Sequence, residues 1–368
     1  MSVKSAEMLA ELSSKSSSSS SPLLFSFASR GEKPKPDYFY IQGDSNSQGL
    51  RPDCAWNLKI GMGRMAEEPW PSVMEKWLTN RGIKAIVENC SETGRRLAGK
   101  THSEAERSSI GAKDGRVALQ QMVGTIFNKH GVKSDKVHII INLGTNDLQD
   151  YHISKDYLKG SLIKHILTVL INPNLQYALL EQISGSEKEL KVTNFFEGLN
   201  RIMAMDIAKS YSETVPITEI EKSSSVDEMA NHGSIFNTFI DENSSVIRDL
   251  FSMINWNFVI VPPVLVRGYP FGSFANAALS QHWPNIVDEV VKFFDVKNIY
   301  SVKDAQKFCI PSSDEMGGSL HLTPQQHKVY GEEMGKFFAS RLALEETAKE
   351  SSVFGKKEAI SVKGTALK

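Results

Sequence analysis

The chain has 368 residues, 40% of them hydrophobic and 23% charged, which is the balance of a soluble globular protein. Its 42 basic and 43 acidic residues leave a formal net charge of −1, which excludes a chain-wide electrostatic attraction to nucleic acids or anionic membranes. Three cysteines without a CxxC motif argue against a disulfide framework and favour a reducing, cytoplasmic environment. Because no apolar run approaches the roughly 20 residues that span a bilayer, we expect no stable insertion into membranes.

Both ends of the chain have the composition of tails. Residues 1–36 contain a serine tract and the polar linker GEKPKP, and neither segment can build a core. We expect them to form a disordered tail. Residues 346–368 are polar and rich in lysine, and we expect a second tail there. One domain, residues 37–345, remains between the two.

Within this domain, apolar runs of strand length alternate with stretches of helical periodicity. Four strands are expected, at Tyr38–Gln42, Ala85–Asn89, Val137–Gly144 and Asn257–Val266. Helices are expected between them, at Pro71–Gly82 and Val117–Gly131 among others. This alternation predicts an α/β fold in which helices cover both faces of a parallel sheet.

Polar residues that can carry chemistry follow these strands. Ser45 comes just after the first strand, Gly94 lies in the turn after the second, and Asn146 follows the third. His321 lies after the last strand. In parallel sheets, chemistry gathers just beyond the carboxyl ends of the strands. We therefore expect these four residues to converge on one site.

Together, these residue types support acyl transfer. A serine hydroxyl is a weak nucleophile until a base takes its proton, and imidazole titrates near neutral pH. Ser45 can serve as this nucleophile and His321 as this base. The backbone N–H groups of Ser45 and Gly94 and the side-chain amide of Asn146 are available as donors to an oxyanion. Each residue also has an ordinary structural interpretation, since the Asp-Ser pair suits a helix cap, an Asn suits a turn and a loop histidine is usually solvated.

In this order, the residues resemble the SGNH, or GDSL-type, hydrolase superfamily, and most of all its bacterial arylesterase branch. The matching blocks are Gly43-Asp44-Ser45, Asn89–Gly94, Gly144–Asp147 and the segment from His321. The resemblance implies a flavodoxin-like three-layer α/β/α sandwich around a central parallel sheet. It implies that Ser45 is the nucleophile, His321 the base, and Ser45, Gly94 and Asn146 the oxyanion hole. It implies no cofactor and no metal.

One position departs from the pattern of the family. Three residues before the histidine the family has an aspartate that orients the imidazole, whereas this chain has Gly318. Asp314, or its neighbour Glu315, is a candidate substitute if the intervening glycine turn folds back. Otherwise a backbone carbonyl orients the ring in a Ser–His dyad, or catalysis is weak or absent.

A second departure is a long insertion. About 110 residues separate Asn146 from the fourth strand, and the stretch at about 171–252 is mostly helical in its periodicity. Methionines and phenylalanines recur in it at helical spacing. The insertion is expected either to pack a core of its own or to form a lid over an acyl pocket.

We therefore expect a serine esterase that hydrolyses carboxylic esters of small or lipid-like substrates, with activity that rises near pH 6.5, the ordinary pKa of imidazole. One alternative is O-deacetylation of carbohydrates at the same site, because Trp56, Trp70 and Trp283 offer surfaces on which sugar rings stack. Another is a catalytically weak binding or scaffold protein, motivated by Gly318. In that case the helical insertion would hold a protein partner or an oligomer.

Overall fold

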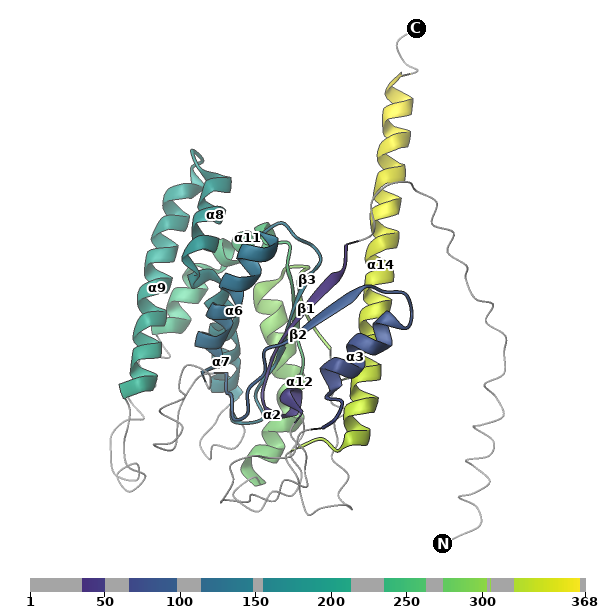
Figure 1. Ribbon diagram of the computed structural model, residues 1–368. Helices are drawn as coiled ribbons and strands as arrows, with labels where there is room; N and C mark the ends of the chain where they lie inside the picture. Colours follow the sequence, from purple (N-terminus) through teal and green to yellow (C-terminus); the bar gives the residue numbers. More distant parts are fainter. Residues whose placement is uncertain are drawn as a thin grey trace. The chain divides into compact units, whose positions relative to one another are not determined.

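The computed structural model describes residues 35–49, 66–97, 114–147, 155–212, 235–262, 274–302, 305 and 321–364. Its centre is a sheet of five parallel strands in the order β2-β1-β3-β4-β5 (Figure 1). The strands are β1 (Asp37–Gly43), β2 (Ala85–Asn89), β3 (Val137–Asn142), β4 (Asn257–Ile260) and β5 (Ile299–Ser301). This order is that of flavodoxin-like folds, so the predicted fold class is confirmed.

Alternate strand residues face opposite sides of the sheet, and each side has its own hydrophobic core. In β1, Tyr40 belongs to the larger core, whereas Phe39 and Ile41 belong to the smaller one. Helices α6 (Gly115–His130), α7 (Lys155–Leu167) and α12 (Phe274–Phe294) lie on the side of the larger core. Helices α3 (Trp70–Thr79) and α14 (Pro324–Gly364) lie on the other side. The sandwich therefore has three layers.

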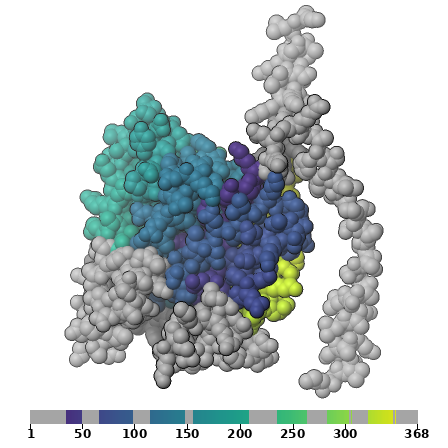
Figure 2. All heavy atoms as spheres, viewed as in Figure 1, coloured from purple at the N-terminus to yellow at the C-terminus, as the bar shows by residue number. Residues whose placement is uncertain are grey.

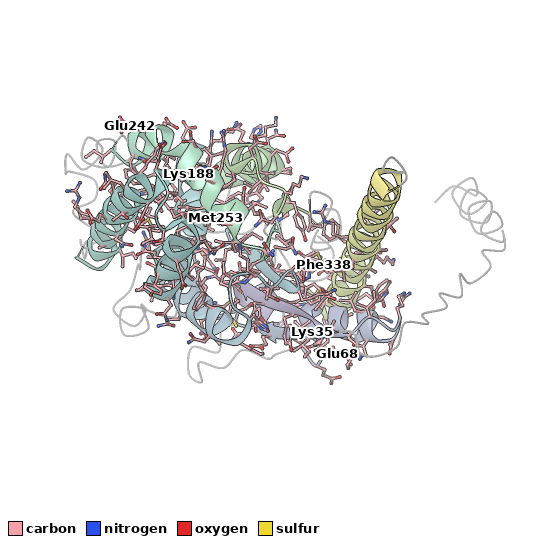
Figure 3. All side chains as sticks on the ribbon, turned by 90° about the horizontal axis from the view of Figure 1, so that it is seen from above. Lys35, Glu68, Lys188, Glu242, Met253 and Phe338 are labelled. Carbon is pink, nitrogen blue, oxygen red and sulfur yellow. The ribbon has the colours of Figure 1, made fainter. Side chains whose placement is uncertain are left out.

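Helices α3 and α14 pack directly against each other, as the adjoining blue and yellow surfaces of Figure 2 show. Two glycines of α14 make this approach possible. A Cβ on Gly331 would lie 2.6 Å from the carbonyl oxygen of Trp70, and one on Gly335 would lie 2.7 Å from the ring of Trp77. Phe338, labelled in Figure 3, packs its ring against the ring of Phe39 in the sheet, with the two ring centroids 4.9 Å apart. These contacts hold the start of α14 over the sheet.

The insertion is built from η2 (Thr168–Ile171), α8 (Pro173–Ile183), α9 (Lys188–Ser212) and α11 (Ser244–Met253). Its buried side chains, including Leu179, Phe195 and Leu250, belong to the same core as the strands and α6. The described part of the insertion is thus continuous with one layer of the sandwich. The prediction of a lid also concerns residues 213–234, which lie outside the described ranges.

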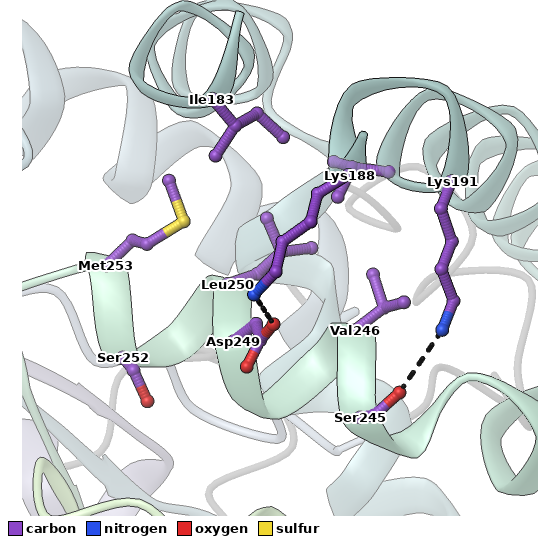
Figure 4. A pocket seen from close by; sticks show the side chains of 10 residues that line it. Ile183, Lys188, Lys191, Ser245, Val246, Asp249, Leu250, Ser252 and Met253 are labelled. Carbon is purple, nitrogen blue, oxygen red and sulfur yellow. Dashed lines mark hydrogen bonds and ion pairs between the residues drawn. The ribbon is translucent and has the colours of Figure 1, made fainter. Parts of the chain in front are cut away.

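A cavity of about 310 Å³ lies between the α8–α9 connection and α11 (Figure 4). Its apolar lining includes Ile183, Leu250 and Met253. At the cavity Lys188 forms an ion pair with Asp249 at 2.7 Å. All the residues that line this cavity belong to the helical insertion or its connections.

The structure differs from the sequence expectations at three elements. β5 was not predicted, because a three-residue strand carries no periodicity. β4 ends at Ile260, two residues before Pro262, because proline cannot donate a hydrogen bond to a sheet. Helix α14 runs on to Gly364, through most of the residues assigned to the second tail, whereas residues 1–34 of the first tail are not described. Within the described ranges, no helix has the length and apolar character of a membrane span.

Candidate active site

The predicted nucleophile lies in a tight turn at the end of β1, an interior strand of the sheet. β1 ends at Gly43, Asp44 caps the one-turn helix α2 (Ser45–Gln48), and Asp44 Oδ1 accepts from the backbone N–H of Asn46 at 2.9 Å. Gly49, with φ of 102°, ends the turn in the left-handed region, which favours glycine. Ser45 is 5% exposed. The buried strand and the two caps hold its hydroxyl in a fixed place.

The predicted base faces this hydroxyl. His321 Nε2 lies 2.9 Å from Ser45 Oγ, although the two residues are 276 positions apart in the chain. The distance is that of a hydrogen bond. In the neutral tautomer in which Nε2 accepts a hydrogen bond from the hydroxyl, the ring carries its own proton on Nδ1. The pair has the geometry that general-base activation of a serine requires.

The segment that carries His321 is anchored where α14 begins. Thr323 and Gln326 form a capping box, in which Thr323 N–H donates to Gln326 Oε1 at 2.8 Å and Gln326 N–H donates to Thr323 Oγ1 at 3.2 Å. His327 is fully buried, and its Nδ1 accepts from the backbone N–H of Trp70 at 3.3 Å. His327 therefore ties α14 to α3.

Three consecutive side chains of α2 each bind a different segment of the site. Asn46 Oδ1 accepts from the backbone N–H of Leu322 at 3.1 Å. Ser47 Oγ donates to Asn142 Oδ1 at the end of β3, at 2.7 Å. Gln48 Oε1 accepts from the backbone N–H of Thr93, in the loop after β2, at 2.9 Å. The nucleophile turn is thus the point at which the other three segments are joined.

The predicted oxyanion donors come from two adjoining loops. Gly94 has φ of 77°, so it occupies the left-handed region that a residue with a side chain adopts only under strain. Asn146 Nδ2 donates to the carbonyl of Arg95 at 3.0 Å, which places the amide beside the Gly94 loop. The N–H of Glu92, in the same loop, donates to the carbonyl of Gly43 at 3.1 Å. The loops after β1, β2 and β3 therefore contact one another.

Burial shifts two pKa values at the site in opposite directions. Desolvation raises the pKa of the Asp44 carboxyl to about 6, against the opposing effect of hydrogen bonds from Asn46 and Thr145. Desolvation lowers the pKa of His321 to about 4, because the buried imidazole resists taking a charge. The expected rise of activity near pH 6.5 therefore moves to lower pH.

Of the other residues named from the sequence, the structure describes Trp70 and Trp283, whereas Asp314 and Trp56 lie outside the described ranges. Asp314, the candidate that orients the imidazole, lies outside the described residues and stays a prediction. Trp70 and Trp283 are fully buried in the two cores, so neither offers a face on which a sugar ring can stack. Trp56 lies outside the described residues.

Sequence reasoning missed the polar residues that join the loops, among them Asn46, Ser47, Gln48 and Asn142. A signal for the first three was present. A run of four polar residues, Ser45–Gln48, directly after a buried strand has no place in a core unless its side chains find partners there. The sequence does not say which partners these are.

Replacing Gly43 with Ala is expected to lower kcat/KM at least 100-fold for the ester hydrolysis that the sequence predicts. A Cβ at this position would lie 2.2 Å from Ser47 Oγ and 2.4 Å from Ser47 Cβ, so α2 must shift, and a displacement of about 1 Å is enough for such a loss. The measurement is steady-state hydrolysis of p-nitrophenyl acetate. The matched control is Gly160→Ala in α7, where an added Cβ meets nothing within 4 Å. Equal activity of the two variants would contradict the prediction.

No protein-family model matches the chain, and no curated protein matches its sequence. Solved structures of esterases are similar to it over most of its length. A carbohydrate acetylesterase from Sinorhizobium meliloti is 13% identical, covers 83% of this chain and 99% of its own, and has a TM-score of 0.47. An aryl esterase from M. smegmatis is 12% identical, with coverages of 83% and 99% and a TM-score of 0.45. A putative arylesterase from Agrobacterium tumefaciens is 15% identical, with the same coverages and a TM-score of 0.44.

Proposed function

We propose that the chain is a serine ester hydrolase of the SGNH kind, with Ser45 as nucleophile and His321 as general base. The observation that carries this proposal is the 2.9 Å contact between Ser45 Oγ and His321 Nε2. It joins two residues that the sequence motifs single out independently. The parallel sheet supports it too, because the nucleophile turn and the two donor loops follow three adjacent strands, β1, β2 and β3.

In the first half of the reaction, Ser45 Oγ attacks the acyl carbon as its proton passes to His321 Nε2. The carbonyl oxygen takes the displaced electron pair and becomes an oxyanion. When the carbonyl re-forms, the bond to the alcohol oxygen breaks and the imidazolium gives its proton to that oxygen. In the second half, water repeats these steps on the acyl-enzyme and releases the carboxylic acid.

The oxyanion would be held by the backbone N–H groups of Ser45 and Gly94 and by the amide of Asn146. The hydrogen bond from Asn146 to the carbonyl of Arg95 orients that amide before substrate arrives. Donors that are already oriented need no reorganisation as charge develops, and removing one such donor typically lowers kcat about 10²–10³-fold. The left-handed Gly94 allows the loop to approach the substrate closely.

Replacing Ser45 with Ala is expected to abolish covalent labelling by a fluorophosphonate and to lower hydrolysis of p-nitrophenyl acetate by several powers of ten, because the group that forms the acyl-enzyme is gone. Labelling is followed by intact-protein mass spectrometry, and hydrolysis by release of p-nitrophenol. The matched control is Ser245→Ala, which changes a serine in α11 at the cavity of the helical insertion. Labelling of Ser45→Ala at the wild-type rate would refute the assignment.

For the substrate, we propose a carboxylic ester of a small or lipid-like molecule. The burial of Trp70 and Trp283 removes two of the three aromatic residues that motivated a carbohydrate substrate. A panel of p-nitrophenyl esters of increasing chain length, with acetylated xylan as the saccharide substrate, compares the two classes directly. Higher kcat/KM on the acetylated saccharide would reverse this choice.

A further inference from the structure

We propose that Asn46 is a positioning residue, which sets where the His321 imidazole lies relative to the Ser45 hydroxyl. This inference rests on the function proposed above for Ser45 and His321. Asn46 directly follows the nucleophile in α2 and is fully buried. Its Oδ1 accepts from the N–H of Leu322, the residue directly after the base, at 3.1 Å. One hydrogen bond therefore joins the neighbours of the two reacting residues.

The direction of this N–H is coupled to the histidine. The N–H of Leu322 belongs to the planar peptide unit that runs from the Cα of His321 to the Cα of Leu322. Fixing where that N–H points fixes this plane and with it the position of the His321 Cα, from which the imidazole extends toward Ser45. The other described anchors of this segment, the Thr323–Gln326 capping box and the contact of His327 with Trp70, lie farther along α14. They hold the helix rather than the histidine.

Asn46 is itself held in place. Its backbone N–H donates to Asp44 Oδ1 at 2.9 Å, within the same turn that presents Ser45. The acceptor that orients the histidine segment is therefore built on the nucleophile turn. The bond from Leu322 N–H to this acceptor couples the position of the histidine segment to that of the nucleophile turn.

Packing alone does not explain an asparagine at this position. Asn46 Nδ2 is buried and makes no hydrogen bond of good geometry among the described residues, although the Asn46 side chain helps to lower the pKa of the Asp44 carboxyl. A buried amide whose donor is poorly hydrogen-bonded destabilises the folded state, whereas an apolar side chain of similar volume avoids that cost. The side-chain amide of Asn46 accepts a hydrogen bond from the N–H of Leu322, and a leucine at position 46 has no atom that could accept it.

The test compares Asn46→Leu, which removes the acceptor, with Asn46→Asp, which keeps one. We expect Asn46→Leu to lower kcat for p-nitrophenyl acetate 10- to 100-fold with KM changed less than about threefold, because the base is misplaced while substrate contacts remain. We expect Asn46→Asp to recover most of the lost kcat. The backbone amide of Leu322 should lose its protection from hydrogen exchange in Asn46→Leu and keep it in Asn46→Asp.

The matched control is Asn172→Leu at the start of α8. Asn172 is also a buried asparagine, and its Oδ1 also accepts a backbone N–H, that of Leu175, at 3.1 Å. The same substitution there removes the same kind of bond in the helical insertion, so we expect it to lower the melting temperature and leave kcat unchanged. If Asn46→Leu does not fold, as judged by circular dichroism, Asn46→Ser removes the amide with a smaller change of volume.

The outcomes separate this inference from the proposed function. If wild-type protein neither hydrolyses esters nor reacts with a fluorophosphonate at Ser45, the proposed function fails, and protection of the Leu322 amide still reports whether Asn46 holds the segment. If kcat of Asn46→Leu equals that of wild type while Leu322 loses protection, the positioning role is overturned. If Asn46→Asp is as slow as Asn46→Leu although Leu322 stays protected, the role is overturned as well.

Discussion

Replacing His321 with Gln is expected to lower kcat for p-nitrophenyl acetate by about 10⁴- to 10⁶-fold while the protein stays folded. Glutamine offers an amide of similar reach, but it cannot accept and return a proton at neutral pH. With Nε2 at 2.9 Å from Ser45 Oγ, His321 is in position to take the hydroxyl proton directly. Without that transfer, the serine stays a weak nucleophile.

A matched control for this loss is His282→Gln, which changes an exposed histidine of α12 and should leave kcat unchanged. The double variant Ser45→Ala with His321→Gln should be about as slow as Ser45→Ala alone, because residues that act as one unit are not additive. Near-normal turnover by His321→Gln would rule out this histidine as the base. It would then favour the catalytically weak or scaffold hypothesis only if fluorophosphonate labelling were also absent.

The pH dependence of kcat/KM is expected to keep its plateau well below pH 6.5. The base must be neutral to act, and burial lowers the pKa of His321 to about 4. Lowering the pKa extends the neutral form toward acid pH, so activity is lost only as pH falls through about 4. At pH 4.5 an imidazole with a pKa of 6.5 would be about 1% neutral, whereas one with a pKa near 4 is about three-quarters neutral.

A second group at the site titrates in the same range and needs a control. The carboxyl of Asp44 has a pKa raised to about 6 by burial, so it takes up a proton as pH falls through that value. Asp44→Asn keeps an oxygen that accepts from Asn46 N–H and has no carboxyl to titrate. An inflection near pH 6 that disappears in this variant belongs to Asp44, and the one that remains near pH 4 belongs to His321. Release of p-nitrophenol is followed at its isosbestic wavelength.

The same profile decides how the imidazole is oriented. An ionised carboxylate bonded to Nδ1, the role for which the sequence offers Asp314 as one of several alternatives, would stabilise the imidazolium and hold the pKa of His321 up. If kcat/KM instead falls as the pH drops through 6.5 or a higher value, the burial effect is contradicted. If the pH of that fall then moves back toward 4 in Asp314→Asn, the carboxylate that binds Nδ1 is that of Asp314.

Much of the fold could be predicted because parallel strands leave a strong signal. A strand buried on both faces reads as an unbroken apolar run, as β3 does. The edge strand β2 is only partly buried, and it was predicted at its observed bounds, Ala85–Asn89, from its short apolar run and the polar turn that follows. The predicted Val137–Gly144 exceeds β3 by two residues, because Leu143 is buried like the strand before it. β5 was missed because only three residues form it, and its place beside β4 depends on backbone pairing that leaves no side-chain pattern.

The candidate site could be predicted only in part, for a physical reason. Ser45, Gly94 and Asn146 follow strands, so the topology of a parallel sheet brings them to one edge. His321 lies far beyond the last predicted strand, so its motif, rather than the topology of the sheet, carried its assignment. Asn46 and Leu322 are 276 positions apart in the sequence, so their contact depends on how the whole domain folds, which no local pattern encodes. The pKa values were out of reach as well, because desolvation depends on everything packed around the group.

The distance in sequence between nucleophile and base has a consequence for synthesis. Ser45 leaves the ribosome 276 residues before His321, which at about 5–20 residues per second is roughly 14 to 55 s of translation. During that interval the nascent chain holds a serine hydroxyl with no partner to activate it. The proposed hydrolysis can therefore begin only after the sheet has closed through β5 and the start of α14 has docked, so an unfinished or prematurely terminated chain is expected to be inactive toward esters.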